Sequence, residues 1–136
     1  MRRVILASLV LTACASAQAA APRQWDSTVR GTPGNENVRA SARANSGSGQ
    51  TAVSINLAGG RPGASHPWHI HTGTCAASGG IVGDRAAYMA LQPDGSGNAT
   101  SVARLAVELI PGQSYIVNVH ESPQNMGRII SCGSLN

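Results

Sequence analysis

Short segments in which apolar and polar residues alternate are the feature that most constrains the fold of this chain. Residues 38–44 alternate in this way, residues 45–50 form a turn rich in Ser and Gly, and residues 51–57 alternate again. Successive side chains of a β-strand point to opposite faces, so this pattern predicts a hairpin whose strands each bury one face. No convincing helix is predicted after residue 19.

Similar segments recur along the rest of the chain. Further strands are predicted around the histidine-rich stretch 66–74 and at 88–91, 103–109, 115–120 and 128–132. Residues 76–86 are rich in Gly and small side chains and are predicted to form a loop. Seven to eight short strands at this spacing predict an all-β domain, either an antiparallel sandwich or a barrel.

The N-terminal residues indicate export. Residues 1–19 combine a positively charged start, an apolar run too short to span a bilayer and a small-residue cleavage site, which is typical of a signal peptide. An alternative interpretation is a bacterial lipobox at 11–14, in which Cys14 is lipid-modified and the leader is 1–13. We therefore expect a periplasmic protein, either soluble or held at the membrane through Cys14.

A chain of 136 residues has room for one domain. Residues 20–36 show weak periodicity and are predicted to be a flexible tether, which leaves 37–136 as the folded domain. Removal or acylation of Cys14 leaves Cys75 and Cys132 as the remaining cysteines. An oxidising compartment favours a disulfide between them.

Charge and composition argue against a nucleic-acid partner. All ten basic residues are Arg, and loss of Arg2 and Arg3 with the leader lowers the net charge from +4 to +2. The chain has no Lys and no basic run, and aromatic residues make up only 3% of it. Stacking platforms and basic grooves for nucleic acid are therefore not expected.

Histidines carry the clearest chemical signal. The chain has four, and His69 and His71 lie two positions apart on a predicted strand, so their rings share one face. Trp68 and Ile70 would then face the core, and both histidines would point out of it. His120 likewise alternates with the apolar side of its own predicted strand. Three imidazoles on the outside of one small barrel predict a metal site.

Three segments resemble the copper/zinc superoxide dismutase superfamily: 69–75, 115–121 and 128–133. The order of elements resembles that family from about residue 38 to 135. The resemblance implies a Greek-key barrel with one copper ion held by His69, His71 and His120, and a disulfide between Cys75 and Cys132. A more distant resemblance to chordin-type domains implies the same fold.

Departures from the family pattern change the expected ligands. Loop 76–87 contains no His, and its one candidate ligand, Asp84, cannot build a four-coordinate zinc site, so no zinc is expected. The usual fourth copper ligand is missing as well. His66 is the candidate substitute, with a turn residue or an outer donor as the alternative. Met89 and Met126 are conceivable soft ligands, although Met more often fills gaps in a core.

Arg128 is a candidate for guiding an anion to the metal. The family's arginine precedes the second cysteine by three positions, whereas Arg128 precedes Cys132 by four. One residue of slip on a regular strand moves a side chain to the opposite face. A bulge near Gly127 would restore the guiding role, and without one Arg128 is a solvated charge.

These features predict an exported copper-binding protein of the superoxide dismutase type, which converts superoxide to oxygen and hydrogen peroxide at a copper-only site. Its expected partners are superoxide or the copper ion itself. The alternatives are a non-catalytic copper carrier or buffer outside the cytoplasm, and a structural barrel whose histidines bind no metal.

Overall fold

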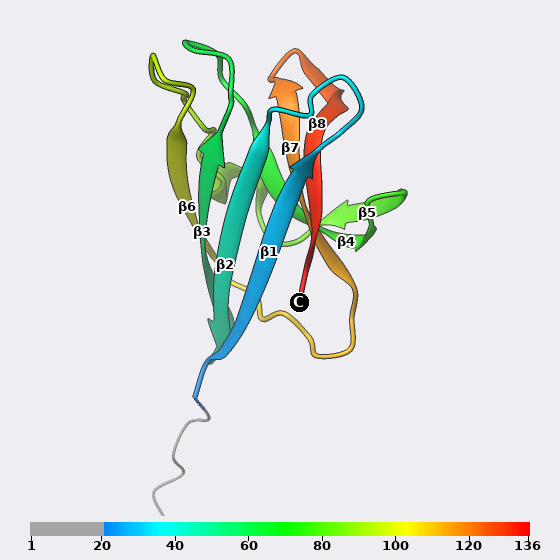
Figure 1. Cartoon of the computed structure of the whole chain (residues 1–136). Coiled ribbons are helices and arrows are strands. Elements are labelled where there is room, and N and C mark those ends of the chain that lie inside the picture. Colours follow the sequence, from blue (N-terminus) through cyan, green and yellow to red (C-terminus); the bar gives the residue numbers. More distant parts are fainter. Residues whose placement is uncertain (1–20) are drawn as a thin grey trace, which may run out of the picture.

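The computed structural model describes residues 21–136, which form one antiparallel sheet of eight strands (Figure 1). The strands are β1 (Arg23–Gly31), β2 (Arg39–Gly47), β3 (Gln50–Ala58), β4 (Trp68–Thr74), β5 (Ala77–Ile81), β6 (Ala99–Leu105), β7 (Tyr115–Ser122) and β8 (Asn125–Leu135). The predicted all-β class is confirmed. The predicted signal peptide at 1–19 and the lipidation site at Cys14 lie outside the described residues. Within 21–136, no helix has the length and apolar character needed to cross a membrane.

The sheet is curled into a half-barrel with the strand order β5-β4-β7-β8-β1-β2-β3-β6. Alternate side chains point into its concave side and form the core. The most completely enclosed of these are Val29, Ile55, Trp68, Ile70, Leu91, Val117 and Val119, each with 0% of its surface exposed. Burial of these apolar side chains is the main stabilising contribution expected for such a sheet.

The predicted hairpin is confirmed as β2 and β3, which pair along their whole length from Arg39↔Ala58 to Gly47↔Gln50. Two residues connect the strands, and both have positive φ: 53° at Ser48 and 78° at Gly49. Two-residue turns of this kind match the twist of antiparallel strands, and Gly adopts the required conformation without strain.

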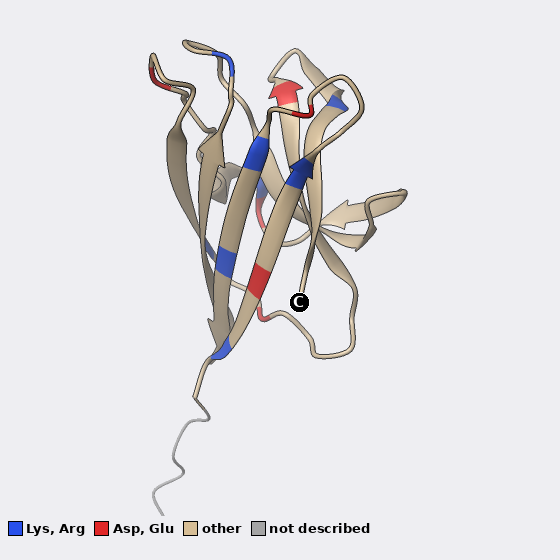
Figure 2. Cartoon of the chain, viewed as in Figure 1, with Lys and Arg blue, Asp and Glu red and all other residues tan. Residues whose placement is uncertain are grey.

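The outward face of β1 and β2 is polar and charged (Figure 2). Arg30, Arg39 and Arg43 are exposed there, and Asp26 forms an ion pair with Arg43 at 2.8 Å. A surface ion pair of this kind contributes little stability. This face of the sheet is therefore exposed to water, while the opposite face forms the core.

The prediction of a flexible tether at 20–36 is wrong for 23–31, which form β1. Trp25, Ser27 and Val29 point inward with 7%, 6% and 0% exposure, and the residues between them face solvent. The ring of Trp25 packs edge-on against Tyr115, with centroids 5.8 Å apart. This segment becomes a strand because β2 and β8 pair with it on either side.

β1 and β8 approach each other closely at Gly133. A Cβ atom at this position would lie 2.3 Å from the carbonyl oxygen of Thr28, so only Gly fits. Beyond the ladder, the backbone N–H groups of Asp26 and Asn136 each donate to the other residue's carbonyl, at 2.7 and 2.9 Å. The first and last strands of the described fold are therefore joined directly.

The segment that follows β4 differs from the prediction. The expected loop contains β5, which pairs with β4, and the expected strand at 88–91 is absent. In its place the chain forms a single 3-10 turn, η1 (Arg85–Ala87), followed by one isolated bridge between His66 and Leu91. The predicted disulfide between Cys75 and Cys132 is present.

The strand predicted at 103–109 begins earlier, at Ala99, and ends at Leu105 as β6. Beyond it, the carbonyl of Val107 accepts a hydrogen bond from the Thr51 hydroxyl at 2.7 Å, and the N–H of Leu109 donates to Ser46 at 2.7 Å. Side-chain hydrogen bonds replace the ladder here, while Leu109 remains buried.

Candidate metal centre

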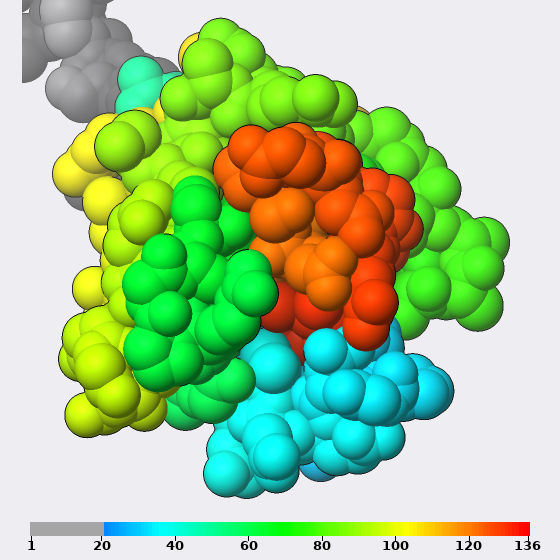
Figure 3. Space-filling model, turned by 90° about the horizontal axis from the view of Figure 1, so that it is seen from above, coloured from blue at the N-terminus to red at the C-terminus, as the bar shows by residue number. Residues whose placement is uncertain are grey.

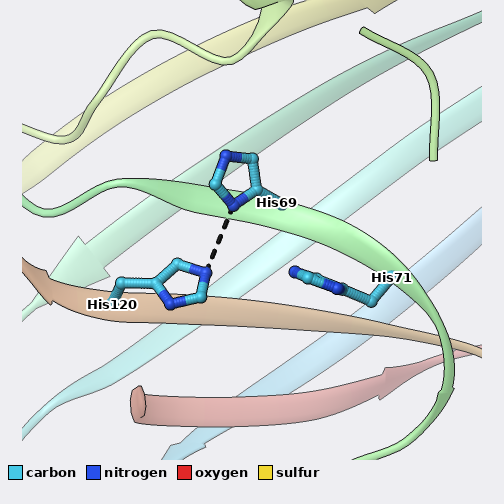
Figure 4. A group of neighbouring side chains, drawn as sticks. All are labelled: His69, His71 and His120. Carbon is cyan, nitrogen blue, oxygen red and sulfur yellow. Dashed lines mark hydrogen bonds between the residues drawn. The ribbon is translucent and has the colours of Figure 1, made fainter. Parts of the chain in front are cut away.

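Three of the four histidines converge on one point of the sheet (Figure 4). β4 carries His69 and His71, and the neighbouring antiparallel strand β7 carries His120. One ring nitrogen from each residue lies within 4.8 Å of the other two. The ring centroids are 5.2 to 6.0 Å apart. The predicted trio is therefore assembled by the pairing of two adjacent strands.

Backbone carbonyls fix the orientation of two of these rings. Nδ1 of His71 lies 3.0 Å from the carbonyl oxygen of Gly79, and Nδ1 of His120 lies 2.6 Å from that of Met126. A carbonyl only accepts hydrogen bonds, so each Nδ1 carries the proton and each Nε2 keeps a free lone pair. Carbonyl contacts of this kind are typical of metal-binding histidines.

The free nitrogens are positioned as a donor set. Nε2 of His71 is buried and has no hydrogen-bond partner, and Nε2 of His120 lies 3.2 Å from Nδ1 of His69. Leaving a buried imidazole nitrogen unpaired is unfavourable. Nε2 of His120 and Nδ1 of His69 form a hydrogen bond with each other. A cation bound between the three rings would satisfy the unpaired nitrogen of His71 and replace that hydrogen bond, so the residues present fit a metal ion.

The rings lie on the outer side of the half-barrel, as predicted, but they are more enclosed than expected. Only 2% of His69 and 5% of His120 is exposed, while His71 is partly exposed. The ring of Tyr88 packs edge-on against His69, with centroids 5.1 Å apart. The segment after β5 therefore folds back over the centre, and we refer to residues 82–89 as the cover.

Hydrogen bonds within this cover and to the rest of the fold hold it in place. The hydroxyl of Tyr88 donates to the carbonyl of Val82 at 2.7 Å, and Nε1 of Trp68 donates to the carbonyl of Met89 at 2.8 Å. Burial raises the pKa of Tyr88 to about 12, so its hydroxyl remains a donor across the physiological range. Tyr88 thus serves as a fixed apolar wall beside His69.

Burial also favours the neutral form of two of these imidazoles, His69 and His120. It lowers the pKa of His69 to about 4, and the charges of His120, His71 and Arg85 act in the same direction. Burial lowers the pKa of His120 as well, although the Met126 carbonyl opposes this by accepting a hydrogen bond from the ring. Neutral imidazole is the form that binds metal.

We expect the metal-free protein to become less stable as the pH falls below 6.5. The ordinary pKa of His is 6.5, whereas that of His69 is about 4 in the fold, so the unfolded chain binds more protons between these values. The contribution of His69 to the free energy of unfolding is therefore fully present above pH 6.5 and is lost as the pH falls towards 4. Thermal unfolding in a chelator at pH 7.5, 6 and 5 measures this decline. A double variant, His69→Gln with His120→Gln, should show a weaker dependence, and an unchanged pH profile in that variant would contradict the assignment.

His66 does not join the other three histidines. It is 3% exposed, and its Nδ1 contacts the carbonyl oxygens of Glu121 at 2.8 Å and His120 at 3.2 Å. His66 therefore does not act as a fourth ligand. Its hydrogen bond to the backbone at His120 corresponds instead to the alternative role of a residue that supports a ligand from outside the metal site. The structure therefore assembles three of the four predicted ligands.

Arg128 lies on the surface in an ion pair with Glu121, with Nε 3.3 Å from the carboxylate. Register shifts do occur between β7 and β8, on both sides of His120, which pairs with Ile129. The irregular pairing thus lies at His120 itself, between β7 and β8. It leaves the guanidinium of Arg128 engaged with a carboxylate.

The other candidate ligands have different roles. Met89 is 69% exposed, and Met126 contributes its carbonyl to the orientation of His120. Asp84 caps η1 by accepting the N–H of Ala86 at 2.9 Å.

Several neighbours of the centre were not predicted from the sequence. Asn118 is fully buried opposite His69, with Oδ1 unpaired and its amide N–H donating to Ser78 at 3.1 Å. Asn118 lies two residues before His120 on a predicted strand, so the alternation of side chains could have placed it on the same face as the histidines. Gly79 and Arg85 have no comparable signal, because their segment read as a loop.

Comparisons with known proteins do not identify this chain. No protein-family model matches it, and no curated protein matches it in sequence. Its function must therefore be inferred from its residues and their geometry.

Proposed function

We propose that this chain is an exported copper protein of the superoxide dismutase type, which binds one copper ion through His69, His71 and His120. The observation that carries the proposal is the unpaired, buried Nε2 of His71 beside two further imidazole nitrogens. Imidazole suits copper and zinc, and copper binds nitrogen donors more tightly. A structural zinc site takes four protein ligands, and three converge here among residues 21–136.

The proposed reaction is superoxide dismutation. Bound copper would supply a one-electron couple, by which one superoxide is oxidised to oxygen and a second is reduced, taking up two protons to form hydrogen peroxide. The chain's own part is to hold three imidazole nitrogens within reach of one ion. The positive charge of Arg85, which acts on both His69 and His120, favours the approach of an anion.

The fold and the disulfide support this assignment. β3 pairs with β6 and β4 pairs with β7, although neither pair is consecutive in the chain, and such long connections are compatible with the proposed Greek-key barrel. The bridge between Cys75 and Cys132 is typical of proteins outside the cytoplasm.

A non-catalytic copper carrier is the second candidate. Its support is the enclosure of the centre, since His69 and His120 are 2% and 5% exposed and Tyr88 covers one ring. A closed site retains a metal well but restricts the access of a substrate.

Copper titration of the purified protein tests the shared part of both candidates. His69→Ala and His120→Ala should each weaken copper binding by at least about 100-fold, since changes in outer contacts alone cost roughly 10- to 100-fold. Met89→Ala removes an exposed alternative soft ligand and should leave the affinity unchanged. Unchanged affinity in both histidine variants would refute a copper site. Superoxide turnover no faster than that of free copper ion would then favour the carrier.

A further inference from the structure

A second pocket opens at the end of the sheet where loop 34–38, the segment at 59–61 and the end of β7 meet. Its volume is about 340 Å³, and none of the three metal-centre histidines lines it. Figure 3 shows the hollow between the cyan, green and orange parts of the chain. Pockets of this size accommodate small organic ligands.

His66 lines this pocket and carries an unpaired nitrogen. Its Nδ1 contacts two carbonyl oxygens, so Nδ1 holds the proton and Nε2 is a hydrogen-bond acceptor. Nε2 is buried without a hydrogen-bond partner, and only 3% of the surface of His66 is exposed. A buried acceptor without a partner is unfavourable, so a ligand that donates a hydrogen bond here gains affinity.

Two unpaired charges of opposite sign line the same pocket. Within residues 21–136, neither Glu36 nor Arg61 takes part in an ion pair, whereas Glu121 is paired with Arg128. The carboxylate of Glu36 accepts one backbone hydrogen bond, from Gly34 at 2.8 Å. The pocket thus offers a carboxylate and a guanidinium outside any ion pair, together with the ring of His66.

We propose that this pocket binds a small zwitterion of the α-amino-acid type. Its ammonium group meets Glu36 and Nε2 of His66, and its carboxylate meets Arg61, for which the planar guanidinium is a suitable partner. A simple anion would gain no contact with Glu36 or His66, and a simple amine would gain none with Arg61. The site is separate from the copper proposal and does not depend on it.

NMR titration of the metal-free protein with glycine tests this site, with ethanolamine and acetate as probes that each carry one of the two charged groups. Glycine should shift the backbone amide signals of Glu36, Arg61 and His66 in a saturable way. Ethanolamine and acetate should each bind at least about 10-fold more weakly, since each lacks one charge-assisted contact.

Variants locate the contact. Glu36→Gln should weaken glycine binding by at least about 10-fold. Glu108→Gln is the matched control, because Glu108 also accepts a backbone N–H from a glycine, Gly49, but lies outside the pocket. Absence of saturable shifts, acetate binding as tightly as glycine, or equal glycine affinity in Glu36→Gln and Glu108→Gln would each overturn the proposal.

Discussion

Replacing Cys75 and Cys132 together by Ser is expected to lower the free energy of unfolding by about 4 kcal/mol, according to the chain-entropy estimate for this loop length. The bridge joins positions 57 residues apart, so it removes many extended conformations from the unfolded chain. For a domain of this size, such a loss is a large fraction of the total stability. Denaturant unfolding of the oxidised wild type and the double variant measures it.

Reduction provides the control for this experiment. The wild type unfolded in the presence of a thiol reductant should reproduce the loss, and the double variant should not respond to the reductant. The bridge also holds the turn between β4 and β5, and β5 supplies the Gly79 carbonyl that orients His71. We therefore expect weaker copper binding in the double variant. A stability loss below about 1 kcal/mol would contradict the entropic contribution assigned to the bridge.

Trp68→Ala is expected to destabilise the fold by about 3–5 kcal/mol, the range for truncation of a large buried aromatic side chain. Trp68 is completely buried, and its ring packs edge-on against Tyr88 with centroids 5.0 Å apart. Its Nε1 also donates to the carbonyl of Met89. The substitution therefore removes core packing and one of the hydrogen bonds that hold the cover over His69.

A second readout separates these two losses. Because the cover buries His69, its loosening should raise the pKa of that ring from about 4 towards the ordinary value. NMR titration of the imidazole measures this shift. Val102→Ala is the matched control, since this apolar side chain is 64% exposed and its truncation should change stability by less than about 0.5 kcal/mol. Equal stability of the two variants would refute the packing role of Trp68.

Strands that carry their own apolar residues were predictable from the sequence. The alternation at 51–57 and 115–120 places Val53, Ile55, Val117 and Val119 on the inner face, as the structure shows. The same alternation placed His69, His71 and His120 on the outer face. Periodicity of two fixes which side chains share a face, so this part of the site followed from local sequence.

Elements that depend on a partner strand were not predictable. β5 has the sequence Ala-Ser-Gly-Gly-Ile and is exposed along most of its length, so pairing with β4 alone makes it a strand. β1 contains Ser27 at an inward position, which weakens its alternation. Tyr88 and Leu91 are buried, as expected of a strand, but they do not form one. Tyr88 belongs to the cover, and Leu91 forms an isolated bridge with His66.

The environment of the histidines was beyond local sequence for the same reason. Spacing brings the three rings to one face but does not show that a later segment covers them. Burial is the main cause of the low pKa of His69, and the cover contributes to that burial through Tyr88. Nor does spacing show that His66 turns its Nδ1 to the backbone of β7, away from the trio.

The seam between β1 and β8 has a consequence for how the chain folds. Thr32, just after β1, donates its hydroxyl to the carbonyl of Ile129, 97 positions away, and Asp26 exchanges hydrogen bonds with Asn136. Closing so long a loop is entropically costly, and folds dominated by distant contacts form slowly. The β2–β3 hairpin can form early from neighbouring residues, whereas β1 gains its second partner only after the last strand is in place. Folding of this sheet should therefore be slow and should end at the seam.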